Sequence, residues 1–206
     1  MKRGETVILA AGDFPQKGTE AWQLLTAAQR VVCCDRAANL YHRSFRKWPT
    51  VTVGDMDSAE RPGGIVVRID EQDTNDLAKA VRYCEAMGWK NPVILGATGK
   101  REDHTFGNVF RAMDFGLEVV TDYGRFVPVE GTRSFSVEKG ATVSIFVTDP
   151  KTKVSSKGLE WPLNDVVFEN LYCATLNRAT SKRVMLTTSA RVIAPFGSYA
   201  VSASSR

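Results

Sequence analysis

Three short clusters of acidic, glycine and basic residues lie within about a quarter of the chain. They are Gly54-Asp55-Met56-Asp57-Ser58, Asp73-Thr74-Asn75-Asp76 and Gly96-Ala97-Thr98-Gly99-Lys100-Arg101-Glu102-Asp103-His104. Each cluster falls where a hydrophobic strand is expected to end. Carboxylates gathered at strand ends repel one another unless a cation neutralises them. A hard divalent ion together with a polyphosphate would relieve that repulsion. The pattern therefore predicts an enzyme that acts on a nucleotide with magnesium.

The acidic residues also have simpler interpretations. Asp55 and Asp57 are two residues apart, so on an extended segment both side chains point to one side and can share one ion. The alternative is a turn in which they cap backbone donors. Asp73 and Asp76 stand at a predicted helix start, where capping alone would explain them. Lys79 lies one turn beyond Asp76 on the same face, and its alternative is an ordinary solvated lysine.

The glycine-rich segment 96–104 directly precedes a predicted helix, whose N-terminus attracts anions. Two glycines, a threonine, two cations and an Asp-His pair give it the composition of a phosphate-wrapping loop. Asn108 lies one turn beyond His104 and would face the same ligand. The segment is not a Walker loop, which ends in Gly-Lys-Ser/Thr. A histidine-rich zinc site is not expected, because the chain has two histidines.

Two regions with different patterns follow each other along the chain. Up to about Asp122, expected strands (residues 7–10, 31–34, 51–53, 93–95 and 119–121) alternate with expected helices (19–29, 75–87 and 105–115). This predicts an α/β domain with a doubly wound, mostly parallel, Rossmann-like sheet. Ligands of such sheets bind at the carboxyl ends of the strands, where Gly12, Asp35, Asp55 and Gly96 fall.

From residue 123 the helical periodicity disappears. Short strand candidates with turn residues between them cover 134–137, 142–147, 166–168, 184–187 and 191–194. They predict a second, all-β sandwich domain, so the expected domains are 1–122 and 123–206. In this region Trp161 stands next to a proline in a polar stretch. It is either ordinary core or a flat platform for an aromatic or cationic ligand. The serine-rich end, 202–206, is expected to be a frayed tail.

The composition narrows the class of protein. Of the 206 residues 43% are hydrophobic and 24% charged, as in soluble globular proteins. The net charge of +4 without a long Lys/Arg run indicates no nucleic-acid partner. The apolar run near the start is too short for a membrane span. Cys33, Cys34, Cys84 and Cys173 lack zinc-type spacing and are expected to be buried thiols in a reducing compartment, which predicts a cytoplasmic protein.

The motifs, taken in order, resemble those of the thiamin pyrophosphokinase family. Residues 54–58 match its Gly-Asp-Phe-Asp-Ser motif with Met56 in place of Phe. Asp73, Asp76 and Lys79 match its Asp-x-Thr-Asp segment, with Asn75 where Thr is usual. Residues 96–105 match Gly-Ala-Thr-Gly-x-Arg-x-Asp-His-Thr at every fixed position, and residues 158–163 match Gly-Leu-x-Trp-Pro-Leu. The agreement in order and spacing extends over nearly the whole chain.

The resemblance implies transfer of diphosphate from ATP to the hydroxyl of thiamin, giving thiamin diphosphate and AMP. It implies an α/β ATP-binding catalytic domain, a thiamin-binding β-sandwich, and a homodimer in which two subunits share each active site. The implied catalytic residues and Mg²⁺ ligands are Asp55, Asp57 and Asp76. The implied ATP-binding residues are Asp35, Lys79, Thr98, Arg101, Asp103, His104 and Asn108. The implied thiamin-binding residues are Gln72, Asp76, Trp161 and Asn177.

The chain departs from the family pattern at three places. Arg36 stands where the family has a glycine next to its Ala-Asp. The first strand ends Ala10-Ala11-Gly12 where Asn-Gly or Gly-Gly is common, and Leu176 precedes Asn177 where the family has serine. Two other functions remain open at this point: a different magnesium-dependent phosphotransferase or nucleotide hydrolase on the same scaffold, and a non-catalytic nucleotide or thiamin sensor. Intact Asp55, Asp57 and Asp76 argue against the sensor.

Overall fold

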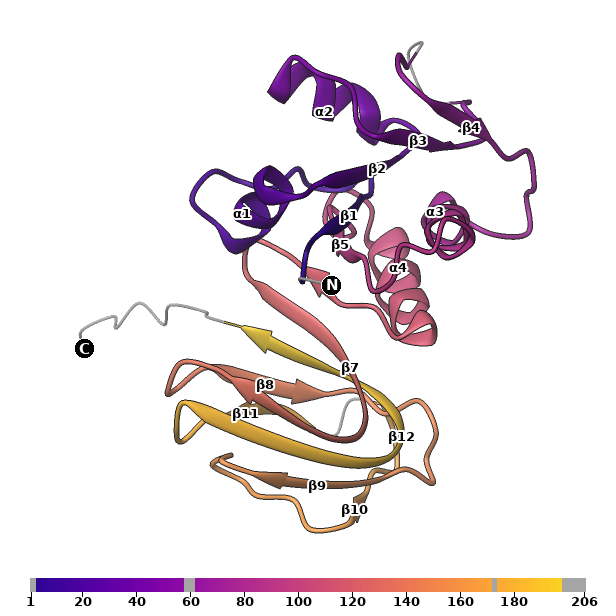
Figure 1. Cartoon of the computed structure of the whole chain (residues 1–206). Coiled ribbons are helices and arrows are strands. Elements are labelled where there is room, and N and C mark those ends of the chain that lie inside the picture. Colours follow the sequence, from indigo (N-terminus) through magenta and orange to yellow (C-terminus); the bar gives the residue numbers. More distant parts are fainter. Residues whose placement is uncertain (1–2, 58–61, 172–173, 198–206) are drawn as a thin grey trace. The chain divides into compact units, whose positions relative to one another are not determined.

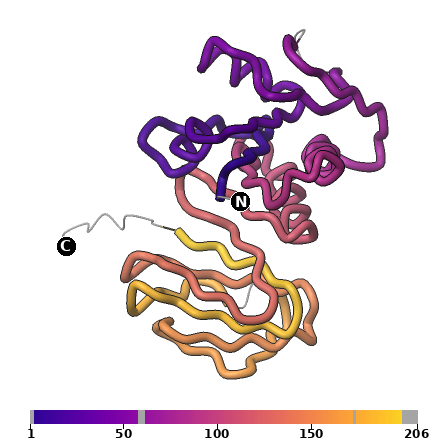
Figure 2. The backbone as a smooth tube through the Cα atoms, viewed as in Figure 1, coloured from indigo at the N-terminus to yellow at the C-terminus, as the bar shows by residue number. Residues whose placement is uncertain are grey.

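The chain divides into two compact units, Met1–Asp122 and Tyr123–Arg206 (Figures 1 and 2). The structure is a computed structural model that describes residues 3–57, 62–171 and 174–197. Ser58, Cys173 and the serine-rich end therefore lie outside the described residues. Within the described ranges, no helix is both long and apolar enough to cross a membrane.

A parallel sheet forms the centre of the first unit. Its strands are β1 (Thr6–Leu9), β2 (Arg30–Cys34), β3 (Val51–Gly54), β4 (Val66–Arg68), β5 (Val93–Leu95) and β6 (Val119–Val120). They run parallel in the order β6-β5-β1-β2-β3-β4. Strands β1 to β4 lie side by side in the order of the sequence, and the next strand, β5, pairs with the other edge of β1. The direction of winding thus reverses between β1 and β5, which is where ligands of open parallel sheets bind.

Four helices cover this sheet: α1 (Glu20–Ala27), α2 (Ala37–Phe45), α3 (Asp76–Ala86) and α4 (Glu102–Phe115). Figure 1 shows α1 and α2 on one side of strands β1 to β3, and α3 and α4 on the other. Val7 and Leu9 pack in one core cluster with residues of α1 and α2. Ile8 between them is also fully buried, so both faces of β1 are covered.

Side-chain caps explain where two of the helices begin. The Thr19 hydroxyl accepts a hydrogen bond from the Trp22 N–H at the start of α1, and Asn75 accepts one from the Ala78 N–H at the start of α3. The helix α4 ends at Gly116 in the left-handed conformation, as the glycine predicts. It begins at Glu102, three residues before the predicted start. Helix α2 and the short edge strand β4 were not predicted.

The second unit is antiparallel and contains no helix among its described residues. Its strands are β7 (Gly124–Ser136), β8 (Thr142–Ile145), β9 (Lys153–Lys157), β10 (Val166–Val167), β11 (Ala174–Arg178) and β12 (Arg183–Gly197). Strand β12 pairs with β7, β8 and β9 and supplies several residues of the core. The two strands predicted at 184–187 and 191–194 are halves of β12, whose pairing with β7 shifts between Thr188 and Val192. The whole chain is a mixed α/β protein.

The described cysteines are buried free thiols. Cys33 and Cys34 end β2, and Cys84 lies on the buried face of α3. Burial raises the pKa of all three thiols, that of Cys84 to about 12, so they stay protonated at neutral pH. The prediction of buried thiols is confirmed for these three residues.

Candidate active site

A cleft of about 470 Å³ opens in the first unit at the carboxyl ends of β1, β2, β3 and β5. Helices α3 and α4 begin beside it. Its walls include Ala10, Ala11, Gly12, Cys34, Asp35, Arg36, Asp55, Gln72, Thr74, Asn75, Asp76, Leu77, Lys79, Ala97, Gly99, Lys100, Arg101, His104 and Asn108. The cleft thus lies at the reversal of winding between β1 and β5, where the order of the strands predicts a ligand site.

Three carboxylates meet at one end of this cleft. Asp35 follows β2, and Asp55 and Asp57 follow β3; each offers one oxygen, and the three oxygens lie within 4.8 Å of one another. Because β2 and β3 are hydrogen-bonded neighbours with Cys34 opposite Val53, their ends carry these residues to the same place. Gly54 makes the approach possible, since a Cβ at this position would lie 2.9 Å from the Asp35 Cβ and 3.4 Å from the Asp76 carboxyl.

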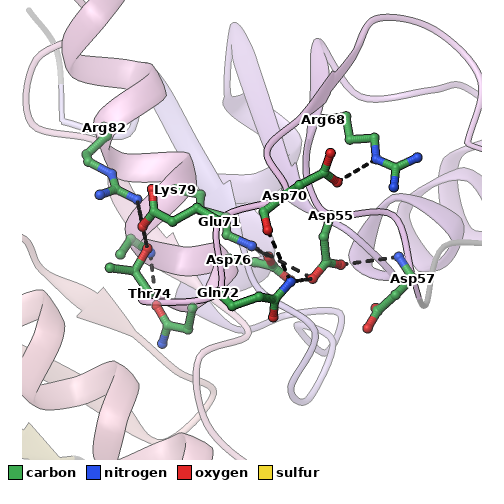
Figure 3. A network of polar contacts seen from close by, with 12 residues as sticks. Asp55, Asp57, Arg68, Asp70, Glu71, Gln72, Thr74, Asp76, Lys79 and Arg82 are labelled. Atoms are coloured by element: carbon green, nitrogen blue, oxygen red, sulfur yellow. Dashed lines mark hydrogen bonds and ion pairs between the residues drawn. The ribbon is translucent and has the colours of Figure 1, made fainter.

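The three carboxylates do not share the same electrostatic environment. Asp55 Oδ1 accepts a hydrogen bond from the Asp57 N–H (3.2 Å), and Asp55 Oδ2 accepts one from Gln72 Nε2 (3.3 Å; Figure 3). The bond from Asp57 N–H, helped by Gln72 and the charge of Lys79, lowers the pKa of Asp55 below its usual value. The negative charge of Asp55 instead raises the pKa of Asp57.

Asp76 borders the same cluster from the first turn of α3. Its Oδ1 lies 3.1 Å from the Nζ of Lys79, and the same Nζ lies 3.9 Å from Asp55 Oδ2 (Figure 3). Burial raises the pKa of Asp76, and the ion pair with Lys79 opposes that rise. The sequence had predicted Asp55, Asp57 and Asp76 as the ligand set, whereas the three oxygens nearest to one another belong to Asp35, Asp55 and Asp57.

The donor set of this cluster fits a hard divalent cation. All three groups are carboxylates, and Mg²⁺ is commonly bound in proteins through one or two carboxylates, substrate phosphates and water. An added cation would also remove the repulsion that raises the pKa of Asp57. Residues Asp35, Asp55 and Asp57 are therefore able to hold such an ion at the edge of the cleft.

The loops after β1 and β5, which also line the cleft, are hydrogen-bonded to each other. The Gly12 N–H donates to the Gly96 carbonyl (2.7 Å), and the Asp13 N–H donates to the Thr98 carbonyl (2.8 Å). A Cβ on Gly12 would lie 2.3 Å from that Thr98 oxygen, so glycine is required for the close approach. The Nζ of Lys100 donates to the carbonyls of Ala11 (3.0 Å) and Gly12 (2.6 Å). The loops after β1 and β5 thus form one connected wall.

The first turns of α4 carry the remaining predicted nucleotide residues. Arg101 donates hydrogen bonds of 3.1 and 2.6 Å to the two carboxylate oxygens of Asp103, and this pair is exposed. The hydrogen bonds from Arg101 lower the pKa of Asp103 to about 2. Asn108 donates to the Ala97 carbonyl (3.0 Å) and so ties the helix to the loop after β5. His104 is exposed at the cleft wall.

In the second unit, Trp161 is exposed and anchored through its backbone. Trp161 is 57% exposed, so of its two interpretations the one as an ordinary core residue is excluded for this chain. Asn177, which is buried, accepts a hydrogen bond from the Trp161 N–H (3.2 Å) and donates one to the Trp161 carbonyl (2.8 Å). Leu176 beside it is 77% exposed and has a φ of +67°, which is unfavourable for leucine.

The cleft brings together most of the predicted site residues of the first unit. These are Asp35, Asp55, Gln72, Asp76, Lys79, Arg101, His104 and Asn108. Asp57 lies beside Asp35 and Asp55 through its carboxylate. Thr98 accepts a hydrogen bond from Asp13, and Asp103 accepts one from Arg101, which lines the cleft. Arg36, which departs from the family pattern, and Lys100, one of the two cations of the glycine-rich segment, also line the cleft.

Two family models match the chain, one for each region. The model described as thiamin pyrophosphokinase, catalytic domain, matches residues 21–120, and the one described as thiamin pyrophosphokinase, substrate-binding domain, matches residues 124–194. The matches define the chain as an enzyme of the diphosphotransferase class. It belongs to the thiamin pyrophosphokinase family, and the resemblance drawn from its motifs is confirmed.

Individual relatives agree with this assignment. Thiamin pyrophosphokinase 1 of Caenorhabditis elegans is 29% identical over 197 residues, which cover 84% of this chain and 81% of the relative. The structure of thiamin pyrophosphokinase from Candida albicans matches with a TM-score of 0.76 at 15% identity, over 93% of this chain and 88% of that one. A thiamin pyrophosphokinase family protein from Enterococcus faecalis matches with a TM-score of 0.76 at 16% identity, over 95% and 99%. The two structures show the shared fold.

Proposed function

We propose that this protein transfers diphosphate from ATP to the hydroxyl of thiamin, giving thiamin diphosphate and AMP. One observation carries the proposal: in a chain of this family, residues of a carboxylate cluster and of two hydrogen-bonded loops, one of them glycine-rich, line the same cleft. The cluster offers ligands for Mg²⁺ and the other wall offers donors for phosphate oxygens. These are the two parts that phosphoryl-type transfer requires.

The two units suit two different substrates. We assign residues 1–122 to a doubly wound, Rossmann-like ATP-binding catalytic domain, and residues 123–206 to a β-sandwich that binds thiamin. The parallel strand order and the helices on both sides of the sheet support the first assignment. The antiparallel strands and the exposed, anchored Trp161 support the second.

The acidic end of the cleft would hold Mg²⁺ through Asp55 and Asp57, with Asp35 as the nearest third carboxylate. When bound, the ion neutralises charge on the triphosphate and favours in-line attack at the β-phosphorus. The thiamin oxygen forms a bond to that phosphorus, the bond to the α-phosphate oxygen breaks, and AMP leaves. Asp76, whose pKa is raised by burial, would accept the proton of the thiamin hydroxyl at a carboxylate oxygen.

The glycine-rich wall would hold the nucleotide. Arg101 and His104 lie at the N-terminus of α4, which favours negative charge. Thr98, Asp103 and Asn108 belong to the same wall and complete the proposed ATP site. Arg36 lines the cleft directly after Asp35, where a guanidinium can pair with a phosphate.

Thiamin would contact Gln72 and Asp76 in the first unit and stack on Trp161 in the second. Asn177 would act through Trp161, because its side-chain amide is occupied by the backbone of that residue. Family membership supports a cytoplasmic homodimer in which each active site takes its two parts from different subunits. The mild net charge of +4 supports small-molecule partners rather than nucleic acid.

One assay tests the reaction. The protein is incubated with ATP, Mg²⁺ and thiamin, and the nucleotide products are separated. AMP formed together with thiamin diphosphate is the expected result. ADP would instead identify a simple kinase, and absence of turnover would identify a protein that only binds these ligands.

A further inference from the structure

Lys79 is a buried lysine at the centre of an acidic site. It is 2% exposed and belongs to the buried face of α3. Its Nζ lies 3.1 Å from Asp76 Oδ1 and 3.9 Å from Asp55 Oδ2, and its side chain reaches the wall of the cleft. The cation therefore stands between one carboxylate of the metal cluster and the carboxylate that borders it (Figure 3).

Burial of an ammonium group is costly unless carboxylates compensate its charge. The ammonium of Lys79 has two such partners, and they come from different elements, the end of β3 and the start of α3. The dependence is mutual, because the same ammonium is an ion-pair partner of Asp55 and of Asp76.

Two other cations of the same cleft, Lys100 and Arg101, are exposed side chains of the glycine-rich loop. Lys100 donates to the uncharged carbonyls of Ala11 and Gly12, and Arg101 pairs with the exposed Asp103. Lys79, by contrast, has its ammonium directed to Asp76 and Asp55, as Figure 3 shows. A phosphate that bound the Lys79 ammonium would have to approach past those two carboxylates, which repel it.

We propose that Lys79 is a positioning residue of the metal site: a built-in counter-ion that orients Asp55 and Asp76, rather than the phosphate contact that the family resemblance implied. This role presupposes the metal-dependent transfer proposed above. A fixed ammonium supplies part of the charge that a second divalent ion would otherwise bring. The carboxylates keep their arrangement before the metal arrives, so little reorganisation accompanies its binding.

Thermal unfolding of the metal-free protein, with and without Mg²⁺ alone, tests this role. The substitution Lys79→Met keeps the length of the side chain and removes its charge. We expect the melting temperature without metal to fall by several degrees, because the carboxylates lose their counter-ion. Added Mg²⁺ should then raise the melting temperature by at least about twice as much as in the wild type, since the metal takes over the missing charge. Lys90→Met, the same change at an exposed lysine beyond α3, should respond to Mg²⁺ as the wild type does.

Steady-state kinetics separate positioning from phosphate binding. For Lys79→Met we expect kcat to fall roughly tenfold or more while the KM for ATP stays within about twofold. A raised KM for ATP with an unchanged response of the melting temperature to Mg²⁺ would identify Lys79 as a phosphate ligand and overturn the proposal.

A milder variant covers the case in which Lys79→Met does not fold. Lys79→Gln keeps a hydrogen-bond donor near Asp76 and should show the same enlarged response to Mg²⁺. If both variants remain unfolded at saturating Mg²⁺, the metal cannot replace the ammonium and the counter-ion role is wrong. A wild-type protein that forms no AMP would overturn the proposed reaction but not these unfolding results, which need no activity.

Discussion

The side-chain amide of Asn177 hydrogen-bonds both backbone groups of Trp161, the N–H at 3.2 Å and the carbonyl at 2.8 Å. The same Asn177 oxygen also accepts the Arg178 N–H at 2.9 Å. The amide oxygen thus accepts two hydrogen bonds and the amide nitrogen donates one within the protein, while the residue it anchors is exposed. An exposed aromatic ring on a fixed backbone suits the stacking of a flat ligand, because little conformational entropy is lost on binding.

Asn177→Ala should therefore affect stability and thiamin binding together. Loss of these part-buried bonds leaves backbone groups without their side-chain partner and should lower the free energy of unfolding by about 1 kcal/mol. The KM for thiamin should rise, while the KM for ATP stays unchanged. Urea unfolding and steady-state kinetics measure both effects. Asn164→Ala, an exposed asparagine near Trp161, is the control. A variant of unchanged stability that no longer binds thiamin would mean that Asn177 contacts the substrate itself.

The substitutions Asp55→Asn and Asp57→Asn should have similar effects on activity and opposite effects on stability. Each removes a proposed metal ligand, so each should lower the rate of AMP formation roughly a hundredfold or more. Without metal at neutral pH, Asp57→Asn should hold or increase stability, because it relieves the repulsion that raises the Asp57 pKa. Asp55→Asn should decrease stability, because the interactions that lower the Asp55 pKa are lost.

Asp73→Asn is the matched control for this pair, since Asp73 is an exposed carboxylate next to α3. It should keep wild-type activity and stability. Thermal unfolding in a chelating buffer and a product assay in Mg²⁺ give the two readings. If Asp57→Asn unfolds while its folded fraction keeps full activity, the carboxylate pair is structural.

Gly54→Ala should damage the metal site through packing alone. The new methyl group would lie 2.9 Å from the Asp35 Cβ, so Asp35 or the end of β3 must move. We expect a loss of about 1–3 kcal/mol in stability, as for overpacked cores, together with weaker Mn²⁺ binding measured by electron paramagnetic resonance. Gly107→Ala places the same methyl in open space within α4 and should instead stabilise by about 0.5–1 kcal/mol. Equal effects of the two changes would contradict the close approach seen at Gly54.

Asp103 should titrate at unusually low pH because of Arg101. Its pKa is lowered to about 2, against about 3.9 for an unfolded aspartate. A lowered folded-state pKa means that the pair stabilises the fold above about pH 3.9 and loses this effect as the pH falls towards 2. An NMR titration of the carboxyl group measures this directly. Arg101→Gln should return the pKa towards 3.9, whereas Lys100→Gln should leave it low.

A shared active site predicts complementation between subunits. Asp57→Asn disables the first unit and Trp161→Ala the second, so a mixed dimer would regain one intact site of two. Random pairing makes half of the dimers mixed, so refolded mixtures should recover about a quarter of native activity. Mixtures that remain as inactive as the separate mutants, although both are folded and dimeric, would show that each chain serves its own site.

The sequence predicts the features that depend on local patterns. Hydrophobic runs followed by glycine or aspartate predicted the positions of β1, β2, β3 and β5. The predicted start of α3, Asn75, is the capping residue of that helix. The acidic cleft followed, because neighbouring parallel strands bring their carboxyl ends to one edge. The prediction divided β12 in two at residues 188–190, although the shift in pairing there lets a single strand continue.

The missed features depend on contacts between distant parts of the chain. The position of Asp35 beside Asp55 requires the register of β2 on β3, which no local pattern reveals. The bonds between Asn177 and Trp161 join residues sixteen positions apart, one in β11 and the other after β9. From the sequence alone, Lys79 is expected to be a solvated lysine on a helix. Its burial is favourable because Asp55 and Asp76 lie beside its ammonium in the fold.

Lys100 donates two hydrogen bonds to the carbonyls of Ala11 and Gly12, and these bonds couple nucleotide binding to the loop after β1. A phosphate that recruited this ammonium would compete with those carbonyls for the same protons. Arrival of the nucleotide would then loosen the loop after β1 as it tightens the loop after β5. The two loops would lose the links made by this ammonium but keep the backbone bonds from Gly12 and Asp13, so the cost of the lost links is part of the nucleotide affinity.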